Sequence, residues 1–281
     1  MGMEEAGIDR PSMRAFRIAY DGQGYWGFQR QPDVETVEDE LFDALRALGI
    51  LEESARKPAG YAAAGRTDRG VSALAQTIGL RCPGWCTPRA LNAELPGAIR
   101  AWASADVPSD FHATHDATSR EYTYHLHAPE VDGDRLRAAL DALSGTHDCH
   151  NLTPDERNTT RTLETDLESD TEAPFFVLRV RAEGFSKQLV RQLVALVRSV
   201  ATGEVPFTRV ERALSAERLD GGAGVGPAPA SPLVLTEVRY PGVEFAVDRE
   251  AAASAREVFE RRRIEHATRA RVASTVADNV R

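Results

Sequence analysis

Lysine, cysteine and long apolar runs are all scarce in this chain of 281 residues. Its only lysines are Lys57 and Lys187, so arginine supplies nearly all of the 34 basic side chains. Three cysteines are too few for a disulfide framework, which fits the reducing cytoplasm. No apolar stretch approaches the roughly 20 residues of a membrane span, and the N-terminus lacks the basic start and apolar stretch of a secretory signal. We therefore expect a cytoplasmic protein that does not enter the membrane.

The charge balance is acidic, with 43 acidic against 34 basic residues and a formal net charge of −9. Hydrated surface carboxylates with little lysine suit solubility in high salt. A GC-rich genome favours the same composition, so both explanations stay open. Net acidity argues against a general nucleic-acid binder, but it leaves room for a local groove in which arginines bind phosphate. The 42% of hydrophobic residues excludes a disordered chain.

Short strands and helices alternate along the sequence. We expect loose residues at 1–13, an acidic turn at 168–172 and a Gly/Pro/Ala-rich loop at 219–229. Expected strands cover 15–20, 60–64, 74–82, 98–107, 119–127, 160–167, 175–182 and 232–240, and expected helices cover 36–48, 88–92, 135–143, 186–201, 208–216 and 251–276. Thr36 and Thr208 are the expected caps of their helices. The pattern restarts near residue 146, which predicts an α+β chain with a subdomain at 14–130, a second at 131–242 and a helical extension at 243–281.

The segment from Ala64 to Ser72 carries the most notable cluster of polar residues. Asp68 lies in a turn between two expected strands, with Arg66 and Arg69 close on either side. Flanking glycines let a backbone approach a ligand. Most Asp-x-Gly segments only cap the following turn, however. By itself this segment leaves a structural and a catalytic role open.

Taken as a whole, the segment resembles the signature of the tRNA pseudouridine synthases of the TruA family. The shared core is Gly65-Arg66-Thr67-Asp68-x-Gly70-Val71, followed by Ala73 and Gln76, and Arg69 and Ser72 are similar to the archaeal branch. Further matches are Tyr20-Asp21-Gly22 with residues 25–31, Leu91-Asn92 with Leu95-Pro96, Phe111-His112-Ala113 with Arg120-x-Tyr122-x-Tyr124, Gly145-Thr146-His147-Asp148, and Gly184-Phe185 with Leu189-Val190-Arg191. The resemblance covers about residues 15–241.

This resemblance implies the pseudouridine synthase fold, with two ferredoxin-like halves, a shared antiparallel sheet and flanking helices. It also implies isomerisation of uridine to pseudouridine at positions 38–40 of the tRNA anticodon arm, by a homodimer that needs no cofactor or metal. Which of these positions are modified stays open. Three residues depart from the family pattern: Thr114 replaces a frequent Arg, Phe28 a common Trp and Cys149 a Phe.

The resemblance also implies the site residues. Asp68 matches the nucleophilic carboxylate, Arg191 the arginine that keeps it ionised, and Tyr122 the tyrosine that stacks on the flipped uracil and takes part in proton transfer. Arg66 matches the residue that holds the flipped nucleotide. Thr67, Gln29, Arg30 and Arg120 are the other implied substrate-binding residues. The carboxylate can attack C1′, help remove a proton from C2′ or attack C6, and the sequence leaves these open.

Competing interpretations rest on cysteine, histidine and the RNA-binding fold itself. Cys82-x-x-x-Cys86 with Cys149-His150 suggests a zinc site, although the spacing is loose. The histidines suggest a metal-dependent hydrolase, but no Ser or Cys nucleophile elbow accompanies them. A non-catalytic RNA-binding module is a further alternative, but a carboxylate such as Asp68 would repel the phosphates that such a module binds. A pseudouridine synthase for other RNA targets is the alternative within the enzyme interpretation.

Overall fold

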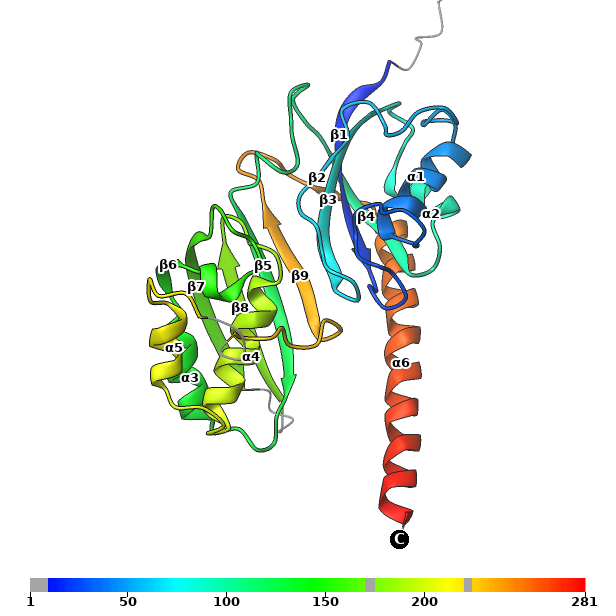
Figure 1. Ribbon diagram of the computed structural model, residues 1–281. Coiled ribbons are helices and arrows are strands. Elements are labelled where there is room, and N and C mark those ends of the chain that lie inside the picture. The colour runs from blue at the N-terminus through cyan, green and yellow to red at the C-terminus, as the bar shows by residue number, and fades with distance from the viewer. Residues whose placement is uncertain (1–9, 170–174, 220–223, 281) are drawn as a thin grey trace, which may run out of the picture.

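The computed structural model describes residues 10–169, 175–219 and 224–280. The expected loose segment 1–13, acidic turn 168–172 and loop 219–229 lie partly outside these residues. Within the described ranges, helices and strands alternate as the sequence pattern predicts (Figure 1). No helix in them is both long enough and apolar enough to cross a membrane.

Antiparallel strands form the centre of the N-terminal half. β1 (Ser12–Tyr20) lies between β3 (Ser72–Cys82) and β4 (Ile99–Asp106), and the short β2 (Ala62–Ala63) pairs with β3. The helices α1 (Val37–Ala47) and α2 (Pro88–Glu94) pack apolar side chains against these strands. Thr36 caps α1 as expected, because its hydroxyl accepts from the amide of Asp39 while the Asp39 carboxylate accepts from the amide of Thr36.

The C-terminal half builds a second hydrophobic core from its own strands and helices. Its strands are β5 (Ser119–His127), β6 (Gly145–Asp148), β7 (Thr160–Ser169) and β8 (Phe175–Ala182), and its helices are α3 (Gly133–Asp141), α4 (Leu189–Ala201) and α5 (Thr208–Ala213). A short 3₁₀ turn, His150–Leu152, lies between β6 and β7. Figure 1 shows α3, α4 and α5 on one face of these strands. Each core therefore has a sheet with helices against it.

One strand joins the two halves into a single sheet. β9 (Leu233–Arg239) pairs antiparallel with β5 and parallel with β3, and the parallel pairing covers only Ser72 with Val234 and Ala73 with Leu235. The strand order is β10-β4-β1-β3-β9-β5-β8-β7-β6, with β10 (Ala246–Val247) at the edge beside β4. All other pairings between these strands are antiparallel. The expected α+β fold with a shared, mainly antiparallel sheet is thus confirmed.

Two local expectations are wrong, and two short strands were not predicted. α4 begins at Leu189 rather than 186, because Gln188 before it has a left-handed backbone with φ of 59°. Thr208 does not cap α5, since Phe207 holds that position and no side chain caps the helix. The short strands β6 and β10 were not expected from the sequence pattern.

The chain ends in α6 (Arg249–Asn279), a helix of 31 residues that matches the helix expected at 251–276. Its buried side chains are Ala251, Ala252 and Ala255, which pack near β4. Arg262 forms an ion pair with Asp21 in the loop after β1. Beyond that point α6 projects away from the rest of the molecule (Figure 1).

Candidate active site

The loop between β2 and β3 carries Asp68 and is anchored in the N-terminal core. The side-chain amide of Gln76, on β3, donates to the carbonyl of Gly65 at 2.9 Å. The hydroxyl of Tyr20, on β1, shares a hydrogen bond of 2.8 Å with the hydroxyl of Thr67, and both residues are buried. The backbone before Asp68 is therefore fixed by two neighbouring strands.

Two glycines let the segment after β1 pass close to this loop. A Cβ at Gly22 would lie 2.1 Å from the carbonyl oxygen of Val71, and one at Gly27 would lie 2.8 Å from that of Thr67. Gly27 also has φ of 102°, which other residues rarely adopt. The approach lets the amide of Phe28 donate to the Thr67 carbonyl at 3.1 Å. Any larger side chain at Gly22 or Gly27 would push the segment away from the loop.

Asp68 forms an ion pair with Arg191 across the boundary between the halves. The Nη1 atom of Arg191 lies 3.2 Å from the Oδ2 atom of Asp68. Arg191 lies in the first turn of α4, and its Nε atom donates to the carbonyl of Ala228 at 2.7 Å. The Asp68 side chain is 26% exposed and that of Arg191 15%. The carboxylate is thus charge-compensated yet open to a ligand.

Tyr122, on β5, lies beside this ion pair. Burial raises the pKa of its hydroxyl well above the ordinary value, and the charge of Asp68 raises it further while Arg120 lowers it. The ring packs edge-on against Phe185, with 5.1 Å between the ring centroids. Tyr124, two residues later on the same strand, is buried in the second core. The Tyr122 hydroxyl is therefore protonated at neutral pH and close to the carboxylate.

Two more arginines from the same loop face solvent. Arg66 makes no hydrogen bond or ion pair with any described residue. The guanidinium carbon of Arg69 lies 3.6 Å from the ring centroid of Trp26, a cation–π contact. The Trp26 side chain is 45% exposed. Free guanidinium groups and an exposed indole suit a ligand with phosphates and bases.

Comparison with known proteins shows which family this chain belongs to. A family model described as tRNA pseudouridine synthase matches residues 139–241. The "tRNA pseudouridine synthase A" of Natronomonas pharaonis is 57% identical over 94% of this chain and 99% of its own length. The chain belongs to the tRNA pseudouridine synthase family. The synthases of Haloarcula marismortui, 54% identical over 95% of this chain and 100% of their own length, and of Methanothrix thermoacetophila, 36% identical over 84% and 86%, agree.

As a pseudouridine synthase, the protein is an isomerase, and the expected family and fold are confirmed. The site residues expected from the motif can now be placed one by one. Asp68, Arg191 and Tyr122 lie together, although they come from three separate segments. Arg66 lies at the same place with its guanidinium unengaged.

Arg120 requires a correction, because it is not available to the substrate of the synthase. All five of its N–H groups donate to backbone carbonyls, namely those of Ala64, Thr114, Ala117 and Glu183. Its side chain is buried, and desolvation lowers the pKa of the guanidinium. Arg120 is therefore a positioning residue that ties the start of the catalytic loop to the C-terminal half.

The other expected substrate-binding residues differ in what they contact. Thr67 is 6% exposed with its hydroxyl bonded to Tyr20, so it positions the loop. Arg30 donates from Nε to Asp39 at 2.6 Å, which ties it to the first turn of α1, and its side chain remains 41% exposed. Gln29 is half-buried and its side chain makes no hydrogen bond to a described residue. Substrate binding by Gln29 and Arg30 stays a prediction.

The metal-based alternatives find no support in the geometry. Cys82 and Cys86 are buried in the N-terminal core, whereas Cys149 is buried in the C-terminal core, so they cannot form one zinc site. Across residues 10–169, 175–219 and 224–280, no three His, Cys, Asp or Glu side chains gather as metal ligands. The described residues therefore offer no ligand set for either the zinc or the hydrolase interpretation.

Two contacts at the site were missed from the sequence. Tyr20 and Trp26 were noted only as motif residues, yet the first anchors Thr67 and the second stacks on Arg69. A signal was present in both cases, since an aromatic residue that closes a strand or follows a Gly-rich turn is a candidate partner for a nearby polar loop. The missing information was which loop packs against which strand.

Proposed function

We propose that this enzyme converts uridine to pseudouridine at positions 38–40 of the tRNA anticodon arm, with Asp68 as the nucleophile. The observation that supports the role of Asp68 is its ion pair with Arg191. A nucleophilic carboxylate needs to stay charged in a site that excludes most water, and a fixed guanidinium balances that charge. The names of the relatives support tRNA as the substrate.

The reaction breaks the N1–C1′ bond, turns the base and forms a C5–C1′ bond. C5 loses its proton, N1 gains one after its bond to C1′ is broken, and no electrons are gained or lost overall. Asp68 can assist by attacking C1′, by helping to remove a proton from C2′ or by attacking C6. Each route needs the carboxylate next to the ribose or the base, which favours a nucleotide flipped out of its stack. No electron or group carrier is needed for this balance.

Tyr122 is proposed to hold the base and to move a proton. Its ring offers a face for stacking, and Phe185 packs edge-on against it. Since burial raises the pKa of the hydroxyl, Tyr122 is a neutral donor throughout the physiological pH range. A neutral phenol beside a carboxylate can relay the proton that leaves C5.

Arg66, Arg69 and Trp26 are proposed to bind the RNA around the flipped nucleotide. Their exposed groups lie on the catalytic loop or against it. Arginine binds phosphate through paired N–H groups, and an indole stacks on a base. These contacts position the RNA, while Asp68 performs the chemistry.

The test is tritium release from tRNA that carries C5-labelled uridine. Asp68→Ala and Asp68→Asn are expected to release no tritium while they stay folded and keep most of their tRNA affinity, because affinity rests on phosphate contacts. Asp110→Asn, an exposed carboxylate outside the site, is the matched control and should retain wild-type turnover. An Asp68→Asn enzyme within about tenfold of the wild-type rate would reject this nucleophile. Transcripts with uridine at only one of positions 38, 39 and 40 then identify the modified sites.

We also propose that the enzyme is a homodimer that acts in the cytoplasm. The family resemblance supports the dimer, in which one subunit orients the tRNA presented to the other. The three cysteines are buried and form no disulfide, which fits a reducing compartment. Light scattering of the purified chain, with and without tRNA, measures the mass, and a monomer in both states would contradict the dimer.

A further inference from the structure

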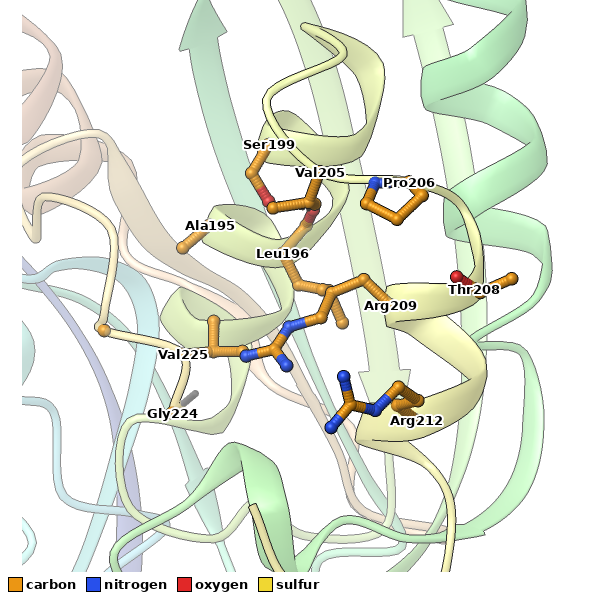
Figure 2. A pocket seen from close by; sticks show the side chains of 11 residues that line it. Ala195, Leu196, Ser199, Val205, Pro206, Thr208, Arg209, Arg212, Gly224 and Val225 are labelled. Atoms are coloured by element: carbon orange, nitrogen blue, oxygen red, sulfur yellow. Dashed lines mark hydrogen bonds between the residues drawn. The ribbon is translucent and has the colours of Figure 1, made fainter. Parts of the chain in front are cut away.

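A pocket of about 480 Å³ lies in the C-terminal half, away from Asp68. It lies between α4, α5 and the segment that begins at Gly224, and Figure 2 shows Arg209 and Arg212 extending from α5 toward Gly224 and Val225. Among the described residues that line it, these two arginines are the charged ones, and none of these lining residues is acidic. The described lining of the pocket therefore carries positive charge, although the net charge of the chain is −9.

Both arginines are unengaged. Neither guanidinium makes a hydrogen bond or ion pair with a described residue. Arg198, one helix away, contrasts with them because it pairs with Glu130 and Glu204. The hydroxyl of Thr208, which also lines the pocket, is not hydrogen-bonded to any described residue either. Two free guanidinium forks and a hydroxyl make a set of donors suited to an anion.

The pocket lies against the same face of α4 as Arg191, further along the helix. Arg191, Ala195 and Ser199 follow each other at four-residue spacing, so they share a face of the helix. Arg191 binds Asp68, while Ala195 and Ser199 line the pocket about one and two turns later. The segment from Gly224 to Ala228 bridges the same distance, since Gly224 lines the pocket and the Ala228 carbonyl binds Arg191.

We propose that Arg209 and Arg212 bind a backbone phosphate of the tRNA next to the flipped uridine. This inference rests on the proposed function, because it needs a tRNA strand that enters the site at Asp68. A phosphate matches the guanidinium forks, and a pocket of this size also has room for the attached ribose. The strand then runs along the exposed face of α4, from Arg191 to α5.

The test measures the dissociation constant of tRNA as a function of KCl, over a range in which circular dichroism shows every variant folded. Arg209→Ala and Arg212→Ala are each expected to weaken binding about tenfold and to lower the slope of log K against log[salt] by about 1. Arg135→Ala, which removes an exposed and unpaired arginine on α3, should change affinity less than about twofold.

Lysine variants separate charge from packing. Arg209→Lys and Arg212→Lys should regain part of the affinity, since α5 packs through Val210 and Ala213 and lysine keeps the positive charge. The proposal is overturned if the double alanine variant matches Arg135→Ala in affinity and slope. It is equally overturned if that variant loses binding of inorganic phosphate but not of tRNA, because the pocket would then serve a free anion.

The same substitutions in an Asp68→Asn background distinguish this proposal from the proposed function. tRNA binding does not require turnover, so the loss of affinity should appear unchanged in that background. If Asp68→Asn stays active and the alanine substitutions still weaken tRNA binding, only the proposal that Asp68 is the nucleophile fails. If Asp68→Asn is inactive and the alanine substitutions leave tRNA affinity unchanged, only the proposed phosphate site fails.

Discussion

Three arginines around Asp68 differ in how many of their N–H groups are already engaged. Arg120 uses all of them on backbone carbonyls, Arg191 shares its own between Asp68 and Ala228, and Arg66 uses none. The side-chain type is the same in each case, so the sequence alone assigns them similar roles. Their hydrogen-bond partners divide them into a positioning residue, a partner of the carboxylate and a candidate ligand for RNA.

The tyrosine hydroxyl can be tested by removing one oxygen atom. Tyr122→Phe keeps the ring and its contact with Phe185 but loses the hydroxyl. If that group moves a proton, the single-turnover rate falls on the order of 10²–10⁴-fold with little change in tRNA affinity. Tyr124→Phe, on the same strand but in the second core, is the control and should turn over normally. An equally active Tyr122→Phe would reduce Tyr122 to a stacking surface.

The motif predicted two residues that the fold brings into contact, but it did not predict which side chains the protein itself uses to hold the site together. Asp68 and Arg191 were predicted from signatures more than a hundred residues apart, and they meet at 3.2 Å. Arg120 was predicted to bind substrate, because a sequence shows that an arginine is present but not that four backbone carbonyls accept all of its N–H groups. Hydrogen-bond partners contributed by distant loops are set by the tertiary fold.

At the scale of elements, Arg120 links the catalytic loop to the C-terminal half, and its loss should be felt in stability. Arg120→Ala leaves the carbonyls of Ala64, Thr114, Ala117 and Glu183 without this donor. We expect the free energy of unfolding to fall by about 2–4 kcal/mol, measured by denaturant titration. Arg137→Ala removes a single part-buried hydrogen bond, to the carbonyl of Leu167, and should cost no more than about 1 kcal/mol. Equal losses in the two variants would contradict the linking role.

Buried tyrosines predict that the strands lose stability at alkaline pH. Burial raises the pKa of the Tyr20 hydroxyl and that of Tyr61 above the value of about 10 they have when unfolded. Above that pH the unfolded chain releases protons that the folded chain retains, so the stabilisation is complete below pH ~10 and is lost as the pH rises toward the folded-state pKa. Each hydroxyl contributes up to about 1.4 kcal/mol per pH unit. Urea unfolding between about pH 8 and 11 measures the slope, which Tyr20→Phe should reduce. A flat profile would contradict it.

The start of α4 shows why the exact ends of helices and strands could not be predicted from the sequence. The helix expected from the sequence begins at Ser186, yet α4 begins at Leu189. The amide of Lys187 donates to the Asp155 carboxylate and its carbonyl accepts from the Thr153 hydroxyl. These partners lie some thirty residues earlier in the chain and hold the segment outside the helix. Strands β6 and β10 were missed because four and two residues are too few to show alternation.

At the scale of the whole molecule, the charge predicts a dependence on salt. The chain carries a net charge of −9, and its relatives in Natronomonas and Haloarcula are haloarchaeal proteins. Screening weakens the repulsion between its acids and tRNA, whereas short-range arginine forks persist when the Debye length is only about 3 Å. We expect activity to rise and then fall between about 0.1 and 3 M KCl, with circular dichroism reporting the fold. A protein fully folded at low salt whose activity only declines would leave genome composition as the explanation.

The parallel seam between β3 and β9 has a consequence for partly assembled molecules. Asp68 and Arg191 are anchored in different cores, and the strands that join these cores are paired through only two residue pairs there. A chain whose halves have formed but not docked lacks the Asp68–Arg191 ion pair. With the roles proposed for these residues, uridine isomerisation therefore requires the docked molecule, because only docking brings the two side chains together.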